Sequence, residues 1–261
     1  MRICRFTTPQ TSTPRFGIIE GASILPLAED ETIESFPSLR TGKPISISKV
    51  KLLAPVAPSK IICVGRNYVD HAAELGNPMP PEPLLFLKAP SAIIGDGETI
   101  ILPGESSDVQ HEGELGVVVG RRARNLRNDE DTFSYVLGYT CVNDVTARDL
   151  QKKDVQFTRA KSFDTFCPVG PAIVTGIDPG DLEVTTRVNR KVRQQGRTSA
   201  MAFSVPFLVR YISRIMTLLP GDLISTGTPA GVSRLERGDR VQVEVSGIGT
   251  LSNEVQTPAN A

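Results

Sequence analysis

The sequence contains no tryptophan, only two histidines and only four cysteines among its 261 residues. The cysteines lie far apart, at positions 4, 63, 141 and 167, each beside apolar neighbours, and no pair has the spacing of a metal or redox motif. We therefore expect buried free thiols in a reducing cytoplasm and no zinc site built on thiolates. With two histidines, few side chains can serve as a base near neutral pH.

Net charge and long apolar runs are missing as well. Lysine plus arginine and aspartate plus glutamate number 29 each, so the formal net charge is zero. This balance gives no support for a nucleic-acid or anionic-membrane partner. No apolar run approaches the roughly 20 residues of a membrane-spanning helix, and the first residues lack the apolar stretch of a secretory signal. We expect a cytoplasmic protein.

Short strands dominate what the sequence does contain. Residues 1–53 are typical of a small β region, and the proline-rich run that follows marks the start of a main domain over 54–261. Helices interrupt the strands without regular alternation, which disfavours a doubly wound or TIM architecture, so we predict an α+β, mostly β fold. The strands expected in the main domain are 60–64, 84–88, 99–102, 114–119, 139–142, 184–192, 223–225 and 240–245. The expected helices are a short one that includes 72–75 and ends at Gly76, then 129–135, 147–153 and 206–216.

Glu112 and Glu114 lie two residues apart, just before a run of three valines. Because side chains alternate along a strand, both carboxylates should face the same side of a strand that leads into the core. At about 4 Å and an effective dielectric constant near 20, two such charges repel by about 4 kcal/mol. Solvent, a proton, a lysine or a metal ion must relieve this repulsion. Taken alone, the pair is more typical of a solvated strand end.

Asp144 follows an apolar strand and precedes a predicted helix. It could cap that helix, or it could be a ligand carboxylate presented where the strand ends. Arg148 and Gln151 follow one and two turns later, roughly on the side of Asp144. Lys161 precedes a semi-apolar segment and could balance the carboxylates, hold an anionic substrate or extend its amine to solvent.

His71 and Glu74 are three residues apart on a predicted short helix, so they share a face. A carboxylate beside an imidazole fixes the tautomer of the ring, as a general base requires; an exposed helix face is the alternative. His111, beside Glu112, could orient a metal ligand. The glycines and hydroxyls of 225–232 could form an oxyanion or carboxylate pocket, or an ordinary turn.

Together, these motifs resemble those of the fumarylacetoacetate hydrolase family, both in their residues and in their order along the chain. The resemblance covers roughly residues 55–255 and rests on the segments 65–71, 111–115, 143–151, 161–166 and 227–229. It implies a mixed β-roll fold with a small N-terminal β region, and a homodimer. It also implies functions for individual residues.

The first implied function is metal binding, by Glu112, Glu114 and Asp144. An oxygen-only set of this kind suits Mg²⁺ or Mn²⁺, with Ca²⁺ possible and Zn²⁺ disfavoured. The resemblance also implies a catalytic lid pair, a catalytic lysine and four substrate-binding residues. These residues are His71 and Glu74 for the lid pair, Lys161 for the lysine, and Arg148, Gln151, Gly227 and Thr228 for the substrate.

A 2-keto acid is the implied small-molecule substrate, because its carboxylate and keto oxygens can chelate the ion, which then stabilises an enolate. The sequence is interpreted first as a hydrolase in which His71 and Glu74 activate water to cleave a C–C bond of an acylpyruvate, a 2,4-diketo acid. The alternatives are oxaloacetate decarboxylation and isomerisation or decarboxylation of 2-hydroxydienoate diacids in aromatic catabolism. A metal-binding protein without turnover is the alternative from another class.

Overall fold

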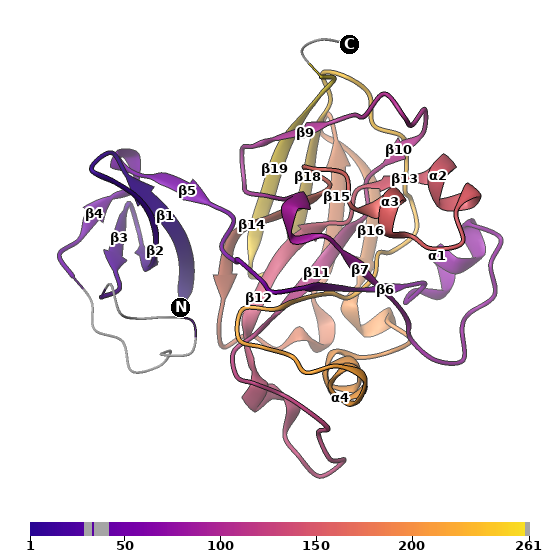
Figure 1. Cartoon of the computed structure of the whole chain (residues 1–261), viewed down its shortest axis with the longest axis horizontal. Helices are drawn as coiled ribbons and strands as arrows, with labels where there is room; N and C mark the ends of the chain where they lie inside the picture. Colours follow the sequence, from indigo (N-terminus) through magenta and orange to yellow (C-terminus); the bar gives the residue numbers. More distant parts are fainter. Residues whose placement is uncertain (29–32, 34–41, 259–261) are drawn as a thin grey trace.

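The computed structural model describes residues 1–28, 33 and 42–258. Two β-sheets make up most of it, and they pack face to face (Figure 1). This confirms the predicted α+β, mostly β fold class. The four cysteines are buried and free, as expected. Among the described residues, no helix is long and apolar enough to span a membrane.

The larger sheet has twelve strands and the smaller has five. The larger contains β1 (Arg2–Thr8), β2 (Thr11–Glu20), β3 (Ser23–Pro26), β4 (Ile45–Ser46), β5 (Lys51–Leu53), β6 (Ile61–Gly65), β7 (Leu84–Lys88), β8 (Ile93–Ile94), β11 (Gly113–Val119), β12 (Val136–Asn143), β14 (Cys167–Val174) and β17 (Leu223–Ser225). The smaller contains β9 (Thr99–Ile101), β15 (Glu183–Val188), β16 (Lys191–Arg197), β18 (Arg240–Val245) and β19 (Gly249–Gln256). The strand orders are β4-β3-β2-β1-β14-β12-β11-β17-β6-β7 and β16-β15-β18-β19-β9.

Helices are short and lie around the sheets. The α-helices are α1 (Val69–Glu74), α2 (Arg148–Lys153), α3 (Thr158–Lys161) and α4 (Val205–Ile215). The 3₁₀ turns are Ile47–Lys49, Pro90–Ala92, Thr132–Tyr135, Pro179–Asp181 and Thr198–Ala200, and a separate two-stranded ladder joins β10 (Val109–Gln110) to β13 (Thr146–Ala147). Figure 1 shows α1, α2 and α3 gathered at one side of the sheets, away from α4.

Strand β11 lies at the centre of the fold. It pairs antiparallel with β12 on one side and with β17 on the other, and all seven of its residues are buried. Leu115 and Val117 belong to one buried cluster with Val243 and Val245 of the smaller sheet. The apolar contact between the sheets therefore carries Glu114, in the same strand, into the interior.

Two predicted elements differ from the structure in kind. The predicted strand 184–192 is a hairpin, because Asn189 and Arg190 both adopt left-handed backbone (φ 50° and 69°), which turns β15 back into β16. The predicted helix 129–135 shortens to the 3₁₀ turn Thr132–Tyr135. There the side chain of Asp131 accepts a hydrogen bond from the Phe133 N–H, so the turn begins at Thr132 and not at residue 129.

The N-terminal strands continue the larger sheet. Strand β1 pairs with β14 through Arg2 opposite Val174 and Ile3 opposite Ile173. Strands β2, β3 and β4 extend outward from β1, to the left of the main body in Figure 1. The boundary near residue 54 stays a prediction, although the hydrogen-bonded sheet crosses it.

Candidate active site and metal centre

A cavity of about 180 Å³ lies where α1, α2 and α3 meet the ends of β6, β7 and β11. It is lined by every predicted site residue except Glu74 and Gly227. Segments that are far apart in the sequence therefore meet at one place.

The three predicted metal ligands lie together in the wall of this cavity. Each of Glu112, Glu114 and Asp144 offers one carboxylate oxygen, and these atoms lie within 4.8 Å of one another. The register explains this, because Gly113 of β11 pairs with Asn143 of β12 and so sets Glu112 beside Asp144. The Asp144 N–H donates to the Glu112 carbonyl at 2.8 Å. All three side chains are buried, so they are not a solvated strand end.

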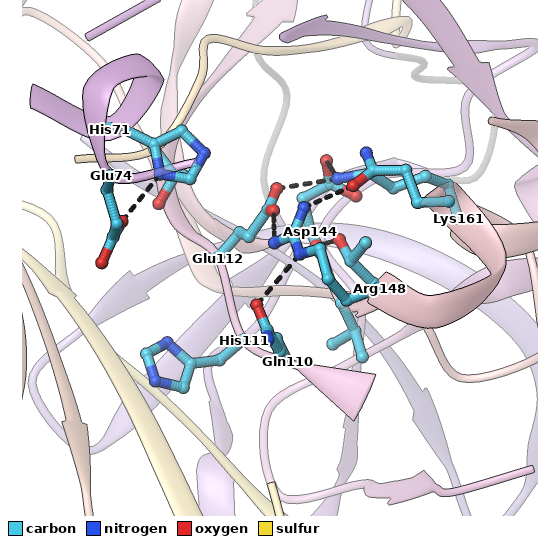
Figure 2. Close-up of polar contacts among 12 residues, drawn as sticks. His71, Glu74, Gln110, His111, Glu112, Asp144, Arg148 and Lys161 are labelled. Carbon is cyan, nitrogen blue, oxygen red and sulfur yellow. Dashed lines mark hydrogen bonds and ion pairs between the residues drawn. The ribbon is translucent and has the colours of Figure 1, made fainter. Parts of the chain in front are cut away.

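Three basic side chains neutralise two of these carboxylates (Figure 2). Lys161 Nζ donates to Glu112 Oε2 and Asp144 Oδ2, both at 2.7 Å. Lys88, which the sequence did not single out, donates to Asp144 Oδ1 at 2.6 Å, and Arg148 donates to Glu112. Burial opposes ionisation of Glu112, yet Lys161 and Arg148 hold its pKa below the ordinary value. Burial likewise favours a neutral Lys161, but Asp144 and Glu112 raise its pKa.

Glu114 has neutral partners only. Its Oε2 accepts hydrogen bonds from Ser225 Oγ at 2.5 Å and from the Gly227 N–H at 2.8 Å, and no basic side chain of the described residues forms an ion pair with it. Burial raises the pKa of Glu114, and the charges of Asp144 and Glu112 raise it further. One carboxylate of the cluster therefore lacks a counter-charge, and three buried carboxylates fit a hard divalent cation such as Mg²⁺ or Mn²⁺.

Helix α2 supplies Arg148, Gln151 and Lys152 to the cavity. Arg148 Nη1 donates to Gln151 Oε1 at 2.5 Å, and Arg148 Nε donates to Gln110 Oε1 at 2.9 Å. The residue before the helix is Ala147 and not Asp144, so the capping alternative for Asp144 is wrong. The Asp144 carboxylate faces the lysines instead.

The predicted lid pair is formed on α1. Glu74 Oε2 lies 3.2 Å from His71 Nδ1, and the Gly231 N–H donates to both oxygens of Glu74 at 3.0 and 3.2 Å. Since an ionised carboxylate only accepts, Nδ1 of the neutral ring carries the hydrogen and Nε2 keeps its lone pair. Figure 2 shows this other ring nitrogen on the side of Glu112, and His71 is nearly buried in the cavity wall.

His111 is not arranged as a base. Its Nδ1 lies 2.9 Å from Gln194 Oε1 and its Nε2 lies 2.9 Å from Ser233 Oγ, so both ring nitrogens have partners. Burial lowers the pKa of His111 to about 4, which keeps the ring neutral near pH 7. Because these partners are not metal-ligand candidates, the contacts give no support for His111 as a group that orients a metal ligand.

Gln194 is a buried residue that the sequence did not single out. Its Oε1 accepts from the Gly113 N–H at 3.0 Å, and its Nε2 donates to Thr228 Oγ1 and to the Pro229 carbonyl, both at 2.7 Å. The Thr228 hydroxyl in turn donates to the Gly113 carbonyl at 2.9 Å. Gln194 therefore fixes the orientation of Thr228 at the cavity wall. Side chains alternate between the two faces of β16, and this alternation is the one sequence signal that could have placed the Gln194 side chain inward.

Replacing Gln194 tests this arrangement. We expect Gln194→Ala to lower the free energy of unfolding by about 1–3 kcal/mol, because the Gly113 N–H and His111 lose a buried partner. Chemical denaturation measures the effect, and Gln195→Ala, an exposed neighbour on the same strand, is the control, with a change within about 0.5 kcal/mol. Equal stability of the two variants would show that the hydrogen bonds of Gln194 do not stabilise the cavity wall.

Comparison with known proteins decides the family. Residues 60–256 match the family described as fumarylacetoacetate (FAA) hydrolase C-terminal, and residues 1–55 match the one described as Rv2993c-like, N-terminal. The chain belongs to the fumarylacetoacetate hydrolase family. This confirms the resemblance that the motifs indicate.

The names of similar proteins refer to several different reactions. Oxaloacetate tautomerase YisK of Bacillus subtilis is 46% identical over 80% of this chain and 74% of its own length. A 2-hydroxyhepta-2,4-diene-1,7-dioate isomerase from Mycobacterium marinum is 44% identical with a TM-score of 0.89, covering 99% of both chains. Maleylpyruvate hydrolase from Sphingobium sp. SYK-6, solved with manganese (II) ion and pyruvate, is 31% identical with a TM-score of 0.80, covering 98% of this chain and 99% of its own.

Proposed function

We propose that this protein is a divalent-metal-dependent tautomerase that interconverts the keto and enol forms of oxaloacetate. The observation that carries the proposal is an oriented imidazole, His71, in the same cavity as a buried cluster of three carboxylates. The 46% sequence identity to the oxaloacetate tautomerase of Bacillus subtilis supports the proposal. Glu112, Glu114 and Asp144 would hold the ion, which when bound supplies the positive charge that makes the C3 proton of a 2-keto acid more acidic.

The protein side chains then handle the proton. His71 Nε2 takes the proton from C3 as the C2–C3 double bond forms, and the same nitrogen returns it to the C2 oxygen. Glu74 holds the ring through Nδ1 and stabilises the imidazolium while it carries the extra proton. Arg148, Gln151 and Thr228 line the cavity and are placed to orient the substrate, as the family resemblance implies.

Hydrolysis of acylpyruvates is the second candidate. The maleylpyruvate hydrolase, which has the same fold and 31% identity, favours it. In that reaction His71 would take a proton from water in place of a carbon acid, and Glu74 would keep the same position. Isomerisation of a 2-hydroxydienoate diacid, the reaction named for the Mycobacterium marinum protein, is the same proton transfer on a longer diacid.

A side-by-side assay with Mg²⁺ tests the proposal. The substrates are enol-oxaloacetate, acetylpyruvate and 2-hydroxyhepta-2,4-diene-1,7-dioate, and released pyruvate also reports hydrolysis or decarboxylation. We expect the highest kcat/KM for loss of the ultraviolet absorbance of enol-oxaloacetate, without pyruvate release. A higher kcat/KM for acetylpyruvate would establish the second candidate, and pyruvate from oxaloacetate would establish the decarboxylase alternative.

A further inference from the structure

The cavity holds more positive charge than its carboxylates neutralise. Four basic side chains line it beside three carboxylates. Two of the four, Arg148 and Lys161, pair with the carboxylate cluster. The other two, Arg66 and Lys152, have no hydrogen bond or ion pair with any part of the chain that the structure describes. A divalent cation held by the three carboxylates would add two further positive charges to the same space.

Arg66 holds an unusual backbone conformation. It lies in the turn from β6 to α1, with φ of 55°, in the left-handed region. This conformation costs a residue other than glycine about 1–3 kcal/mol, and strained residues of this kind cluster at active sites and ligand clamps. The side chain is half-buried in the cavity wall, so the turn places a guanidinium beside the candidate metal site without giving it a protein partner.

Lys152 reaches the same cavity from α2. It follows Arg148 by four residues, and residues four apart share a helix face. Arg148 donates to Glu112, whereas Lys152 is exposed and lines the same cavity. Two unpaired cations from separate elements therefore face one space, which apolar side chains such as Leu84 and Phe157 also line.

These charges fit a substrate with two carboxylates. One carboxylate and the keto oxygen of a 2-keto acid belong at the metal end of the cavity. A monoanion would leave Arg66 and Lys152 unpaired, whereas a dianion can pair with both, and a guanidinium can bind a carboxylate through two parallel hydrogen bonds. We propose that Arg66 and Lys152 bind the distal carboxylate, so that the enzyme selects 2-keto dicarboxylates over monocarboxylates. This inference rests on the proposed function and names the residues that select its substrate.

Binding to the Mg²⁺-loaded protein tests the inference without relying on turnover. Calorimetry compares pyruvate with oxaloacetate, which differ by the second carboxylate alone. The variants are Arg66→Asn, because asparagine tolerates the left-handed backbone, and Lys152→Gln. We expect each to weaken oxaloacetate binding by about 10- to 100-fold and to change pyruvate binding less than about twofold. Lys153→Gln, which lies outside the cavity, is the matched control and should bind both ligands as the wild type does.

The outcomes separate the inference from the proposed function. Equal weakening of pyruvate and oxaloacetate, or no weakening of either, would overturn the assignment of Arg66 and Lys152. Selective weakening of oxaloacetate in a protein that does not tautomerise it would support the subsite and overturn the proposed reaction. A wild type that binds neither ligand would overturn both.

Discussion

The Glu114→Gln variant is expected to lose Mg²⁺ binding and to keep its fold. The amide keeps an oxygen that can accept from Ser225 and the Gly227 N–H, but it removes one of three anionic ligands. Loss of a supporting contact around a metal typically costs about 10- to 100-fold in affinity, and loss of a ligand should exceed that. Calorimetric titration with Mg²⁺ measures the change.

The stability of the same variant provides a second readout. Replacing the Glu114 carboxyl removes a buried group whose ionisation is opposed by burial and by the charges of Asp144 and Glu112. We therefore expect the melting temperature of the metal-free variant to equal or exceed that of the wild type. Glu254→Gln, an exposed carboxylate on β19 paired with Arg240, is the control. If Glu114→Gln binds Mg²⁺ like the wild type, the carboxylate cluster is not the metal site.

The His71→Ala variant is expected to lose tautomerase activity by about 10²–10⁴-fold, the usual contribution of a general acid–base group. Its Mg²⁺ affinity should match that of the wild type, because His71 hydrogen-bonds to Glu74 and, within the described residues, forms no hydrogen bond or ion pair with the three carboxylates. Initial rates at saturating oxaloacetate, together with calorimetry, measure the two effects separately. Loss of Mg²⁺ binding in this variant would mean that His71 supports the metal site.

Two further variants sharpen this test. Glu74→Gln should reduce kcat less than His71→Ala, because the imidazole stays but loses its charged partner. Asp70→Asn, an exposed change on the same helix, should leave kcat unchanged. Full activity in His71→Ala would assign the proton transfer to another group. A wild type that binds Mg²⁺ but converts none of the keto acids would be the metal-binding protein without turnover.

The sequence predicts strands well where apolar residues follow one another or alternate regularly with polar ones. Strands β17 and β18 have the predicted bounds, and β7 does as well. Strand β14 was missed because Pro168 and Pro171 are typical of loops. The structure tolerates Pro171 because the pairing of β14 with β12 shifts between Tyr139 and Cys141, which frees that position from the regular ladder.

The candidate site was predictable from motifs but its charge balance was not. Local patterns brought out Glu112 and Asp144 because each stands in a distinctive stretch of sequence. Lys88 stands at the end of a leucine-rich strand, 56 residues before its partner Asp144. Gln194 lies 83 residues after His111. Such partners meet only through the pairing of distant strands, which no short sequence window contains.

The pairing of β1 with β14 has a consequence for any shortened form of this protein. In the full sheet, β14 has β12 on one side and β1 on the other. A chain cut before residue 56 would lose β1 and leave part of β14 with free backbone N–H and C=O groups along an apolar strand. Open strands of this kind pair with other chains and promote aggregation. The N-terminal strands thus cover this edge of β14, and a form that keeps them is expected to aggregate less than a shortened one.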